Sequence, residues 1–420
     1  MKRIGNMFDK MCTIENLGLA YKNARRGKLR TYGVRIFEKN KDSNLLQLQN
    51  DLLSLNFKTS EYSNFIINEY GKERLISRLP FYPDRIVHHL LMLQLEKIWV
   101  DIFVRNTYAC IKGRGIHDGL TRLKKDLENV EETRYCLKID VRKFYPSIDH
   151  AILKQIVRKK IKDSNLLAVL DEIIDSAPGV PIGNYLSQYF ANLYLAYFDH
   201  YMKEVQQVKY YHRYADDIVI LHSSKAYLHA LLVNISDYMH QNLKLTIKGN
   251  YQIFPVEKRG IDYLGYRIYH THVLLRKSIK KRLFKSLKKV TAENYTLKMS
   301  AYNGWLTHCN SINLKRNINA MNEKRFSDLG IKVDVESLLG EKIKIAKVIG
   351  KEILVKGFKV TDSKYEKTNH CLTIQIEIGG EDKVIFTGSG MLKKQIEQIN
   401  KEDFPFLATI QSINDTYNFV

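Results

Sequence analysis

The segment Lys209–Leu221 constrains this chain most, because two adjacent carboxylates stand inside an otherwise strand-forming run. Asp216 and Asp217 have aromatic and β-branched residues on both sides, a pattern that predicts strand, tight turn and strand. Adjacent like charges repel, so this turn is tolerated where water solvates it or a cation neutralises it. A solvated acidic turn is the simplest interpretation of the segment alone. A magnesium site is the alternative, since Mg²⁺ prefers carboxylate oxygens and keeps water and substrate phosphates as further ligands.

The charge of the chain is large and unevenly distributed. The 420 residues carry a formal net charge of +22, and their number predicts two or three domains. From Glu341 to Val420 there are 12 Lys, no Arg and 11 acids, so this part carries +1 and residues 1–340 carry +21. A soluble chain this basic usually binds a polyanion, most often nucleic acid. A generally basic solvated surface is the alternative, and the uneven distribution counts against it.

Several classes of protein are not expected from the composition. The five cysteines are scattered and show no spacing typical of a metal site, so we expect neither a zinc site nor a disulfide framework. A reducing cytoplasm is the natural setting for such a chain. The N-terminus has no apolar signal region and no run of 18 apolar residues occurs, so we expect no membrane association.

A third carboxylate ends an earlier predicted strand, Arg134–Asp140. If this strand and the Asp216–Asp217 hairpin are neighbours in one sheet, their carboxylates converge. Two Mg²⁺ ions held there would clamp an attacking 3′-hydroxyl and a leaving pyrophosphate. Basic surface on both sides suits a nucleic-acid duplex. The sequence therefore indicates the layout of a nucleotide polymerase.

Other segments predict the surroundings of this site. Residues 1–60 look helical, with a basic run at Arg25, Arg26, Lys28 and Arg30 that is either a solvated face or a phosphate-binding one. Residues 276–289 hold eight Lys or Arg and no acid, with Leu283 and Leu287 at helical spacing, which predicts a basic amphipathic helix. Calmodulin-like or membrane-surface binding is the generic alternative for it. Further predicted elements are a hairpin over 65–78, helices over 85–99, 184–203 and 226–242, and a strand over 243–247. Asp84 is predicted to cap the helix over 85–99.

After about residue 335 the pattern changes to alternating apolar and polar residues. Residues 372–378 and 384–387 predict strands joined at Gly379-Gly380, with a helix over 391–399 and late strands over 406–410 and 416–420. Strand number and size fit a small OB-like barrel, which would suit single-stranded nucleic acid, whereas the low net charge argues against this role. We expect Tyr365, Phe386 and Tyr417 to belong to the core. Docking of another protein or of the template RNA is the alternative role.

Over residues 15–330 the chain resembles reverse transcriptases, because the order of its blocks matches. These are a basic N-terminal extension, fingers, the strand at Asp140, the loop and helix at Gly183, Tyr-Ala-Asp-Asp, the Leu264-Gly265 turn and a basic helical thumb. Within that group it looks most like the reverse transcriptases of diversity-generating retroelements. The discriminating block is 182–188, Ile-Gly-Asn-Tyr-Leu-Ser-Gln, where most retroelement polymerases have Gln before the Gly and Ser-Pro at the end.

The resemblance implies an α+β right-hand polymerase fold with a small C-terminal β-rich domain. The implied regions are an N-terminal extension (1–60), fingers (61–135 with part of 150–180), a palm (136–270), a thumb (271–335) and the β-rich domain (336–420). The C-terminal domain departs from the family pattern, since many members end near the thumb.

Roles of individual residues follow from the same resemblance. Asp140 and Asp216 would bind two Mg²⁺ ions, or Mn²⁺ in their place, with help from the Val141 carbonyl, and Asp217 would support them. Tyr145 stands where an aromatic side chain excludes a ribose 2′-hydroxyl, and ordinary core packing is the alternative. The remaining implied nucleotide-binding residues are Arg74, Arg78, Ile182, Gly183, Gln188 and Lys248, the last as a general acid for pyrophosphate. The implied nucleic-acid-binding residues are Arg25, Arg26, Lys28, Arg30, Leu264, Gly265, Lys280, Lys281, Arg282 and Lys285.

Ile182 carries a hypothesis about fidelity. A Gln at this position can hydrogen-bond near the nascent base pair, whereas Ile offers only apolar contact, so weaker discrimination against wrong pairs is expected. In the resembled group the outcome is misincorporation opposite template adenines. Simple packing of Ile182 under the template is the alternative.

The expected function is RNA-directed DNA synthesis on a template-repeat RNA, giving mutagenised cDNA from deoxynucleoside triphosphates. An accessory variability protein, basic, helical and oligomeric, is the expected partner, in a bacterial or phage-encoded cytoplasmic setting. The alternatives are another bacterial reverse transcriptase, of the group II intron, retron or phage-defence kind, and a non-catalytic RNA-binding scaffold.

Overall fold

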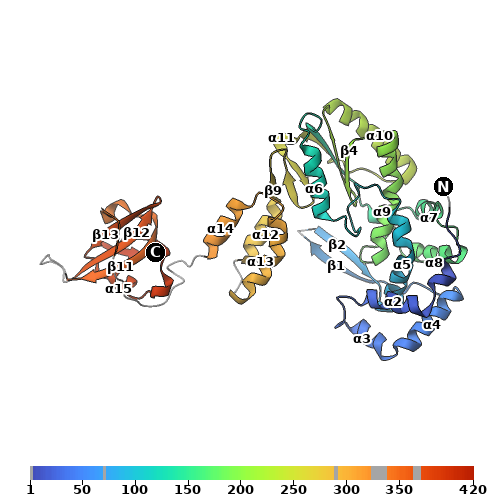
Figure 1. Ribbon diagram of the computed structural model, residues 1–420, viewed down its shortest axis with the longest axis horizontal. Coiled ribbons are helices and arrows are strands. Elements are labelled where there is room, and N and C mark those ends of the chain that lie inside the picture. The colour runs from blue at the N-terminus through green and yellow to red at the C-terminus, as the bar shows by residue number, and fades with distance from the viewer. Residues whose placement is uncertain (1–2, 70–71, 288–291, 323–337, 363–369) are drawn as a thin grey trace. The chain divides into compact units, whose positions relative to one another are not determined.

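The computed structural model describes residues 3–69, 72–287, 292–322, 338–362 and 370–420 (Figure 1). The chain forms two compact units, Met1–Asn310 and Ser311–Val420, which are described separately. The domain boundary expected near residue 336 and the turn at Gly71 lie outside the described residues. No helix of the described chain has the length and apolar character needed to cross a membrane.

The centre of the first unit is an antiparallel sheet of four strands in the order β4-β5-β3-β6. Its strands are β3 (Tyr135–Asp140), β4 (Tyr210–Tyr214), β5 (Asp217–His222) and β6 (Gln252–Pro255). Buried aliphatic residues dominate β5, as a central strand requires. The predicted strand over 243–247 is wrong, because Lys244 adopts φ +50° and ends α10 (Lys225–Leu243) there. Ile247 makes only an isolated bridge to Val141, and β6 takes the place beside β3.

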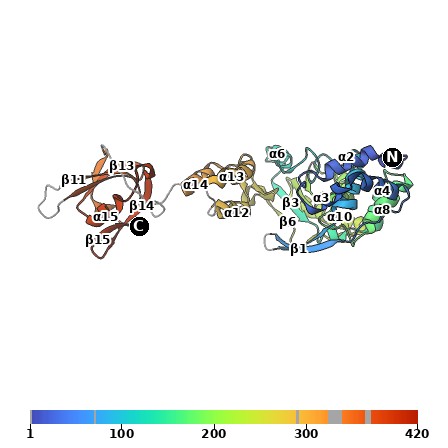
Figure 2. The same ribbon diagram turned by 90° about the horizontal axis from the view of Figure 1, so that it is seen from below.

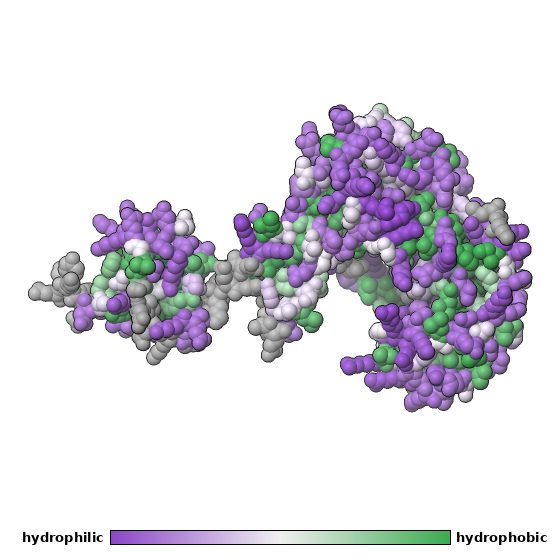
Figure 3. Space-filling view, in the orientation of Figure 1, coloured by the Kyte–Doolittle hydropathy of each residue, from purple (hydrophilic) through white to green (hydrophobic). Residues whose placement is uncertain are grey.

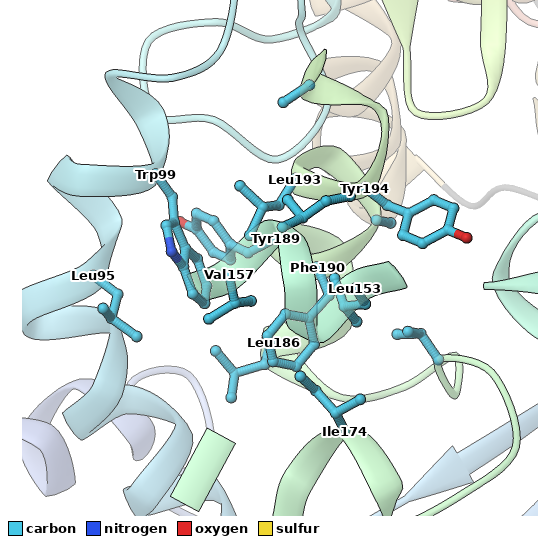
Figure 4. Close-up of a cluster of buried hydrophobic side chains, with 14 of the residues drawn as sticks. Leu95, Trp99, Leu153, Val157, Ile174, Leu186, Tyr189, Phe190, Leu193 and Tyr194 are labelled. Carbon is cyan, nitrogen blue, oxygen red and sulfur yellow. The ribbon is translucent and has the colours of Figure 1, made fainter. Parts of the chain in front are cut away.

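Helices rich in aromatic residues support this sheet. α9 (Tyr185–His200) has buried residues on all sides, and its Tyr189 and Phe190 rings lie 6.4 and 5.7 Å from the Trp99 ring of α5 (Ile86–Val100). Figure 4 shows these side chains with residues of the neighbouring helices gathered in one cluster. α7 (His150–Arg158) and α8 (Ser164–Asp175) complete the packing. The predicted cap of α5 is wrong, because Asp84 is buried in the preceding turn η1 (Phe81–Arg85) and accepts a hydrogen bond from the Ser60 amide.

The N-terminal part is helical, as its sequence predicts. Its helices share the core of the sheet region and are α1 (Phe8–Met11), α2 (Ile14–Ala24), α3 (Tyr32–Lys39) and α4 (Lys41–Leu53). They are followed by the hairpin β1 (Ser63–Glu69) and β2 (Lys72–Arg78). A further helix, α6 (Ile116–Leu127), leads to β3.

After β6 the chain forms α11 (Val256–Arg259) and a small antiparallel sheet of β7 (Ile261–Tyr263), β8 (Tyr266–Ile268) and β9 (Val273–Leu275). The basic helix predicted over 276–289 is α12 (Lys277–Leu287), which buries Ile279, Leu283 and Leu287. Its C-terminal residues 288–289 lie outside the described part. α13 (Ala292–Leu306) follows and places Trp305 against Tyr266 of β8, at a ring distance of 5.4 Å.

The second unit contains α14 (Ile312–Asn322) and a six-stranded sheet with its own apolar core. Its strands are β10 (Glu341–Ile343), β11 (Glu352–Thr361), β12 (Cys371–Ile378), β13 (Glu381–Thr387), β14 (Phe406–Ile413) and β15 (Thr416–Phe419). α15 (Gly390–Ile396) inserts Leu392 and Ile396 into the core beside β15 (Figure 2).

The aromatic residues of this unit do not all behave as predicted. Tyr417 packs partly against the core, and Tyr365 lies outside the described residues. Phe386 is 46% exposed, so its assignment to the core is wrong. The reason is register, because Phe386 pairs with Thr373 on the sheet face opposite to the one that α15 covers.

Candidate active site

Three carboxylates meet at one end of the four-stranded sheet. Asp140 is the last residue of β3 and Asp217 the first of β5, and the two are direct register partners. Asp216 lies at the tip of the β4–β5 hairpin, next to Ala215, which takes the left-handed conformation at φ +53°. The predicted neighbourhood of the two strands is therefore correct, and the strand pairing brings the three acidic side chains together.

The electrostatics of these carboxylates are unusual. Burial, and then repulsion from Asp140, raises the pKa of Asp216 to about 7. Burial also raises the pKa of Asp217, against the opposing effect of Lys138. The Asp217 Oδ1 atom is buried and has no hydrogen-bond partner in the described structure. Three carboxylates with these properties need more positive charge nearby than water alone supplies.

Two lysines supply part of that charge. The Lys248 ammonium lies 2.5 Å from Asp140 Oδ2, and its backbone amide donates to the Asp140 carbonyl at 2.9 Å. Lys138 lies 3.2 Å from Asp217 Oδ2 and also donates to the Asp262 carbonyl. Each lysine pairs with one carboxylate, and Lys248 also slightly opposes the rise in the pKa of Asp216, which forms no ion pair of its own among the described residues.

The donor set fits a divalent metal that takes its other ligands from substrate. The described residues contain no group of three or more His, Cys, Asp or Glu arranged to hold a metal by themselves. Mg²⁺, however, typically binds one or two carboxylates together with water and substrate phosphates. The unpartnered Asp217 oxygen and the raised Asp216 pKa both favour such a cation. The Val141 carbonyl was predicted to help hold the metal. The two backbone hydrogen bonds around the bridge between Val141 and Ile247 involve the Asp140 carbonyl and the Arg142 amide, and neither uses the Val141 carbonyl.

A buried ionic network holds the hairpin from behind. Arg213 is fully buried and binds both oxygens of the buried Asp199, at 2.7 and 2.6 Å. The same guanidinium donates to the Asn192 side chain at 3.2 Å and to the Ala215 carbonyl at 2.8 Å. It therefore fixes the strained residue immediately before Asp216.

Tyr145 lies beside the carboxylates, in the turn η2 (Tyr145–Ser147). Burial raises its pKa to about 12, with smaller contributions from Cys110 and Asp216, so the ring is close to the hairpin tip. Its carbonyl accepts from the Val180 amide at 2.9 Å. A Cβ at Gly179 would lie 2.6 Å from the Tyr145 carbonyl oxygen, so this close approach requires glycine.

The loop at Gly183 is docked onto the β1–β2 hairpin. The Ser77 amide donates to the Ile182 carbonyl at 2.9 Å, and a Cβ at Gly183 would lie 2.7 Å from the Ser77 carbonyl. The Ser187 hydroxyl donates to the Pro181 carbonyl at 2.6 Å and closes the loop. Ile182 is half-buried and Gln188 exposed. In the sequence, Ser187 is only one residue of the block that carries the family resemblance. In the structure, its hydroxyl closes the loop.

A cationic cavity of about 830 Å³ adjoins Gly183. Arg78, Lys28 and Arg85 line it, together with aromatic residues that include Tyr32 and Tyr82, and its lining holds no acidic residue. The neighbouring Arg85, then burial and Arg78, lower the pKa of Lys28, as expected for crowded cations. Figure 3 shows the molecule hollowed on this side, with hydrophilic residues on both rims.

The other predicted basic residues of this region have separate surroundings. Arg25 forms an ion pair with Glu38 at 2.7 Å, whereas Arg26 and Arg30 are exposed in the loop before α3. Arg74 is exposed on β2, opposite Ile67. The structure thus brings Arg78 and Lys28 to one cavity and leaves Arg74 outside its lining.

The Leu264-Gly265 turn and α12 hold the remaining residues that were predicted to bind nucleic acid. Both turn residues have positive φ, and a Cβ at Gly265 would lie 2.4 Å from the Trp305 ring. The Leu264 side chain is nearly buried against Gly119, so only its backbone remains for contact with a ligand. The exposed face of α12 carries the predicted cations Lys280, Lys281, Arg282 and Lys285.

Sequence reasoning missed Arg213, Asp199, Lys138 and Arg85. Arg213 and Lys138 adjoin recognised motifs, so their positions gave a weak signal. Arg85 stood in a block compatible with the family resemblance, whereas Asp199 gave no signal, because burial decides its role and residue type does not reveal burial.

The comparisons with known proteins agree with this geometry. Residues 63–268 match the family model described as reverse transcriptase (RNA-dependent DNA polymerase), and residues 339–420 match a domain of unknown function. Protein YkfC of Escherichia coli (strain K12) is 24% identical over 249 residues, which are 49% of this chain and 65% of that protein. The group II intron-encoded protein LtrA of Lactococcus lactis subsp. cremoris is 21% identical over 153 residues, covering 34% of this chain and 25% of that protein.

Among solved structures, apo telomerase from Candida tropicalis gives a TM-score of 0.41 at 16% identity, covering 55% of this chain and 52% of that chain. The chain spans less than two thirds of the length of the curated relatives cited above. The matched region contains the four-stranded sheet, its helices and all three carboxylates. The expected α+β right-hand polymerase fold with a β-rich C-terminal domain is confirmed, and residues 63–268 of this chain are a reverse transcriptase domain.

Proposed function

We propose that the chain is an RNA-directed DNA polymerase that makes error-prone cDNA, as the reverse transcriptases of diversity-generating retroelements do. The observation that carries the polymerase activity is the pairing of Asp140 with Asp217 beside Asp216, at one end of a sheet inside a reverse transcriptase domain. Deoxynucleoside triphosphates, template RNA and a growing cDNA are the proposed substrates.

The residues of the site suggest how the reaction is performed. Asp140 and Asp216 would hold the divalent cations, with Asp217 in support. When bound, these cations would stabilise the attacking 3′-oxygen and the leaving pyrophosphate. Lys248 would donate a proton to the pyrophosphate after leaving its ion pair with Asp140. Tyr145 would stand against the sugar and exclude a 2′-hydroxyl.

The cationic cavity suggests where unpaired template lies. It begins at Gly183, beside the proposed position of the nascent base pair, and continues along the N-terminal helices. Lys28, Arg78 and Arg85 would bind phosphates there, since charge-assisted Arg–phosphate bonds fix both position and orientation. On the opposite side α12 would follow the duplex.

The proposed activity is tested by primer extension on a poly(rA) template with an oligo(dT) primer. The native chain should extend the primer only with Mg²⁺ or Mn²⁺, and Asp216→Asn should be inactive. A non-catalytic scaffold would bind the template but show no metal-dependent difference between the two proteins.

The error-prone character rests on Ile182. Because an aliphatic side chain cannot hydrogen-bond near the nascent pair, Ile182→Gln should lower the frequency of errors opposite template adenines. Errors opposite the other three bases serve as the internal control. An unchanged adenine error frequency in a variant that polymerises normally would contradict the mutagenic role.

A group II intron-like reverse transcriptase is the second candidate, because YkfC and the intron-encoded LtrA protein are among its relatives. The two candidates differ in template. A nearby pair of near-identical DNA repeats that differ at adenines, and co-purification of a basic helical accessory protein, would favour the retroelement. A flanking structured intron RNA would favour the second candidate.

A further inference from the structure

The C-terminal sheet has a strand order with a known use. Five strands run β13-β12-β11-β14-β15, as a three-stranded meander, then α15, then a hairpin. The first half of β11 pairs with β14 and the second half with β12, with a register shift between Val355 and Gly357. This arrangement matches the OB fold, a partly open Greek-key barrel whose second and third strands present an oligonucleotide-binding face. Here those strands are β12 and β13, and β10 pairs in parallel with the outer edge of β13.

The face of β12 and β13 that points away from the core has a distinct composition. The register places Lys359, Thr373 and Phe386 in one row across three strands. In the next row of the same strands, the paired residues Ile374 and Ile385 point into the core instead. Figure 1 shows β12 and β13 on one side of this unit and α15 on the other. The row is therefore open to solvent, because the helix covers the opposite face.

Phe386 is the exposed aromatic residue of this face. It is 46% exposed, and the Lys342 ammonium lies 4.9 Å from its ring centroid. The core is complete without it, since Ile385 supplies the inward side chain at that point of β13. An exposed aromatic ring with a cation over it combines the two features that bind single-stranded nucleic acid, a surface on which bases stack and a positive charge for phosphates.

The local charge of this face is positive although the whole domain is nearly neutral. Its two acids, Glu377 and Asp382, are both bound by Lys356, at 2.7 and 2.5 Å. Lys342 and Lys359 are exposed and have no acidic partner within the described residues. Lys356 thus neutralises both acids. Lys342 and Lys359, one on each side of the aromatic ring, remain to bind phosphates.

We propose that the outward face of β12 and β13 binds single-stranded nucleic acid, with a base stacked on Phe386 and backbone phosphates held by Lys342 and Lys359. An apolar protein partner fits less well, because this face mixes cations, hydroxyl and amide groups around one ring. The strand bound here is template RNA or released cDNA outside the polymerase domain. Both offer the same bases and phosphates, so the test includes each.

The experiment uses the full chain with its polymerase cleft saturated by a short hairpin primer–template. Fluorescence anisotropy then measures binding of a labelled RNA or DNA single strand of about 12 nucleotides, a length typical of one OB fold. Phe386→Ala should weaken binding about fivefold or more in the arm that represents the natural ligand, because it removes one stacking platform. Lys342→Gln should weaken binding and reduce its salt dependence.

Matched controls come from exposed residues of α15, the helix that covers the opposite face of the same sheet. Met391→Ala and Lys394→Ala change an exposed apolar residue and an exposed cation on α15, and should leave affinity unchanged. Phe386→Leu keeps an apolar side chain and tests the ring itself, with unchanged thermal unfolding as evidence of an intact fold. A 5-iodouridine strand should crosslink to the peptide containing Phe386. Equal affinity in Phe386→Ala, no binding in either arm, or crosslinks confined to other peptides would each overturn the proposal, whether or not the chain polymerises.

Discussion

Lys248 and Asp140 are joined twice, through the ammonium at 2.5 Å from the carboxylate and through the Lys248 amide at 2.9 Å from the Asp140 carbonyl. The backbone bond fixes the lysine beside the carboxylate, and the ion pair occupies an oxygen that a divalent cation would use. The arrangement makes Lys248 a stand-in cation that must leave Asp140 when metal binds.

Replacing Lys248 by Met should therefore separate two effects. The half-saturating Mg²⁺ concentration should fall, because nothing competes for Asp140, while the maximal rate falls about 10²-fold or more through loss of the proton donor. Single-turnover primer extension across a Mg²⁺ titration measures both quantities. Lys244→Met, which removes the exposed partner of Asp149, is the matched control and should change neither. A variant with normal maximal rate would exclude Lys248 as the acid.

The raised pKa of Asp216 predicts a pH-dependent stability of the metal-free protein. Its folded pKa of about 7 lies above the ordinary value of 3.8, so the folded state holds the proton more tightly than the unfolded state. This contribution is present at low pH and is lost as the pH rises from 3.8 to about 7. Asp216→Asn should consequently melt at a higher temperature than the native chain above pH 7, and the difference should shrink on acidification.

Calorimetry with and without Mg²⁺ measures this effect. Adding Mg²⁺ above pH 7 should raise the melting temperature of the native chain and have a smaller effect on Asp216→Asn, because the cation neutralises the carboxylate. If Asp216→Asn melts below the native chain at every pH, repulsion at the hairpin tip is not a source of instability.

The buried pair of Arg213 and Asp199 predicts a difference between stability and activity. Arg213→Met leaves the Asp199 charge buried without a partner and should destabilise the first unit by about 3–5 kcal/mol. Adding Asp199→Leu removes that charge and should recover part of the loss, because the buried hydroxyls of Tyr211 and Thr107 then lack their acceptor. Activity should stay low in the double variant, because the Ala215 carbonyl has lost its hydrogen-bond donor.

Denaturant unfolding and primer extension of the single and double variants separate these effects. Full recovery of both stability and rate in the double variant would show that the network serves folding alone. Recovery of stability without rate identifies Arg213 as a residue that positions the hairpin.

Gly183 predicts how closely the loop must approach the hairpin. Its φ is +128° and a Cβ would lie 2.7 Å from the Ser77 carbonyl, so Gly183→Ala must displace β2 or the loop. We expect a rise in KM for deoxynucleotides of about tenfold, equivalent to about 1.4 kcal/mol. Gly249→Ala is the control, because that position has open space and no positive φ. Steady-state kinetics on poly(rA) compares them, and equal KM values would mean that the loop has no part in nucleotide binding.

The local pattern of the sequence determined much of the fold. Runs of β-branched and aromatic residues predicted the β4–β5 hairpin, alternating apolar residues predicted the C-terminal strands, and helical spacing predicted α12. These patterns reflect which faces of an element are buried. The order of motifs along the chain was enough to indicate a polymerase, since Asp140 and Asp216 are chemically recognisable before their distance is known.

Only the tertiary structure decided which residues support that site. Lys248 meets Asp140 across 108 residues of chain, and Arg213 meets Asp199 across the turn between α9 and β4, and residue type does not reveal such partners. Burial cannot be read from residue type either. Phe386 was predicted to be a core residue and is exposed, because the strand register turns it to the uncovered face. Asp84 was predicted to cap a helix and is instead buried in the preceding turn. Strand register, the pairing of separate segments and burial are properties of the assembled fold. They determine which charges of this protein are left without a neutralising partner.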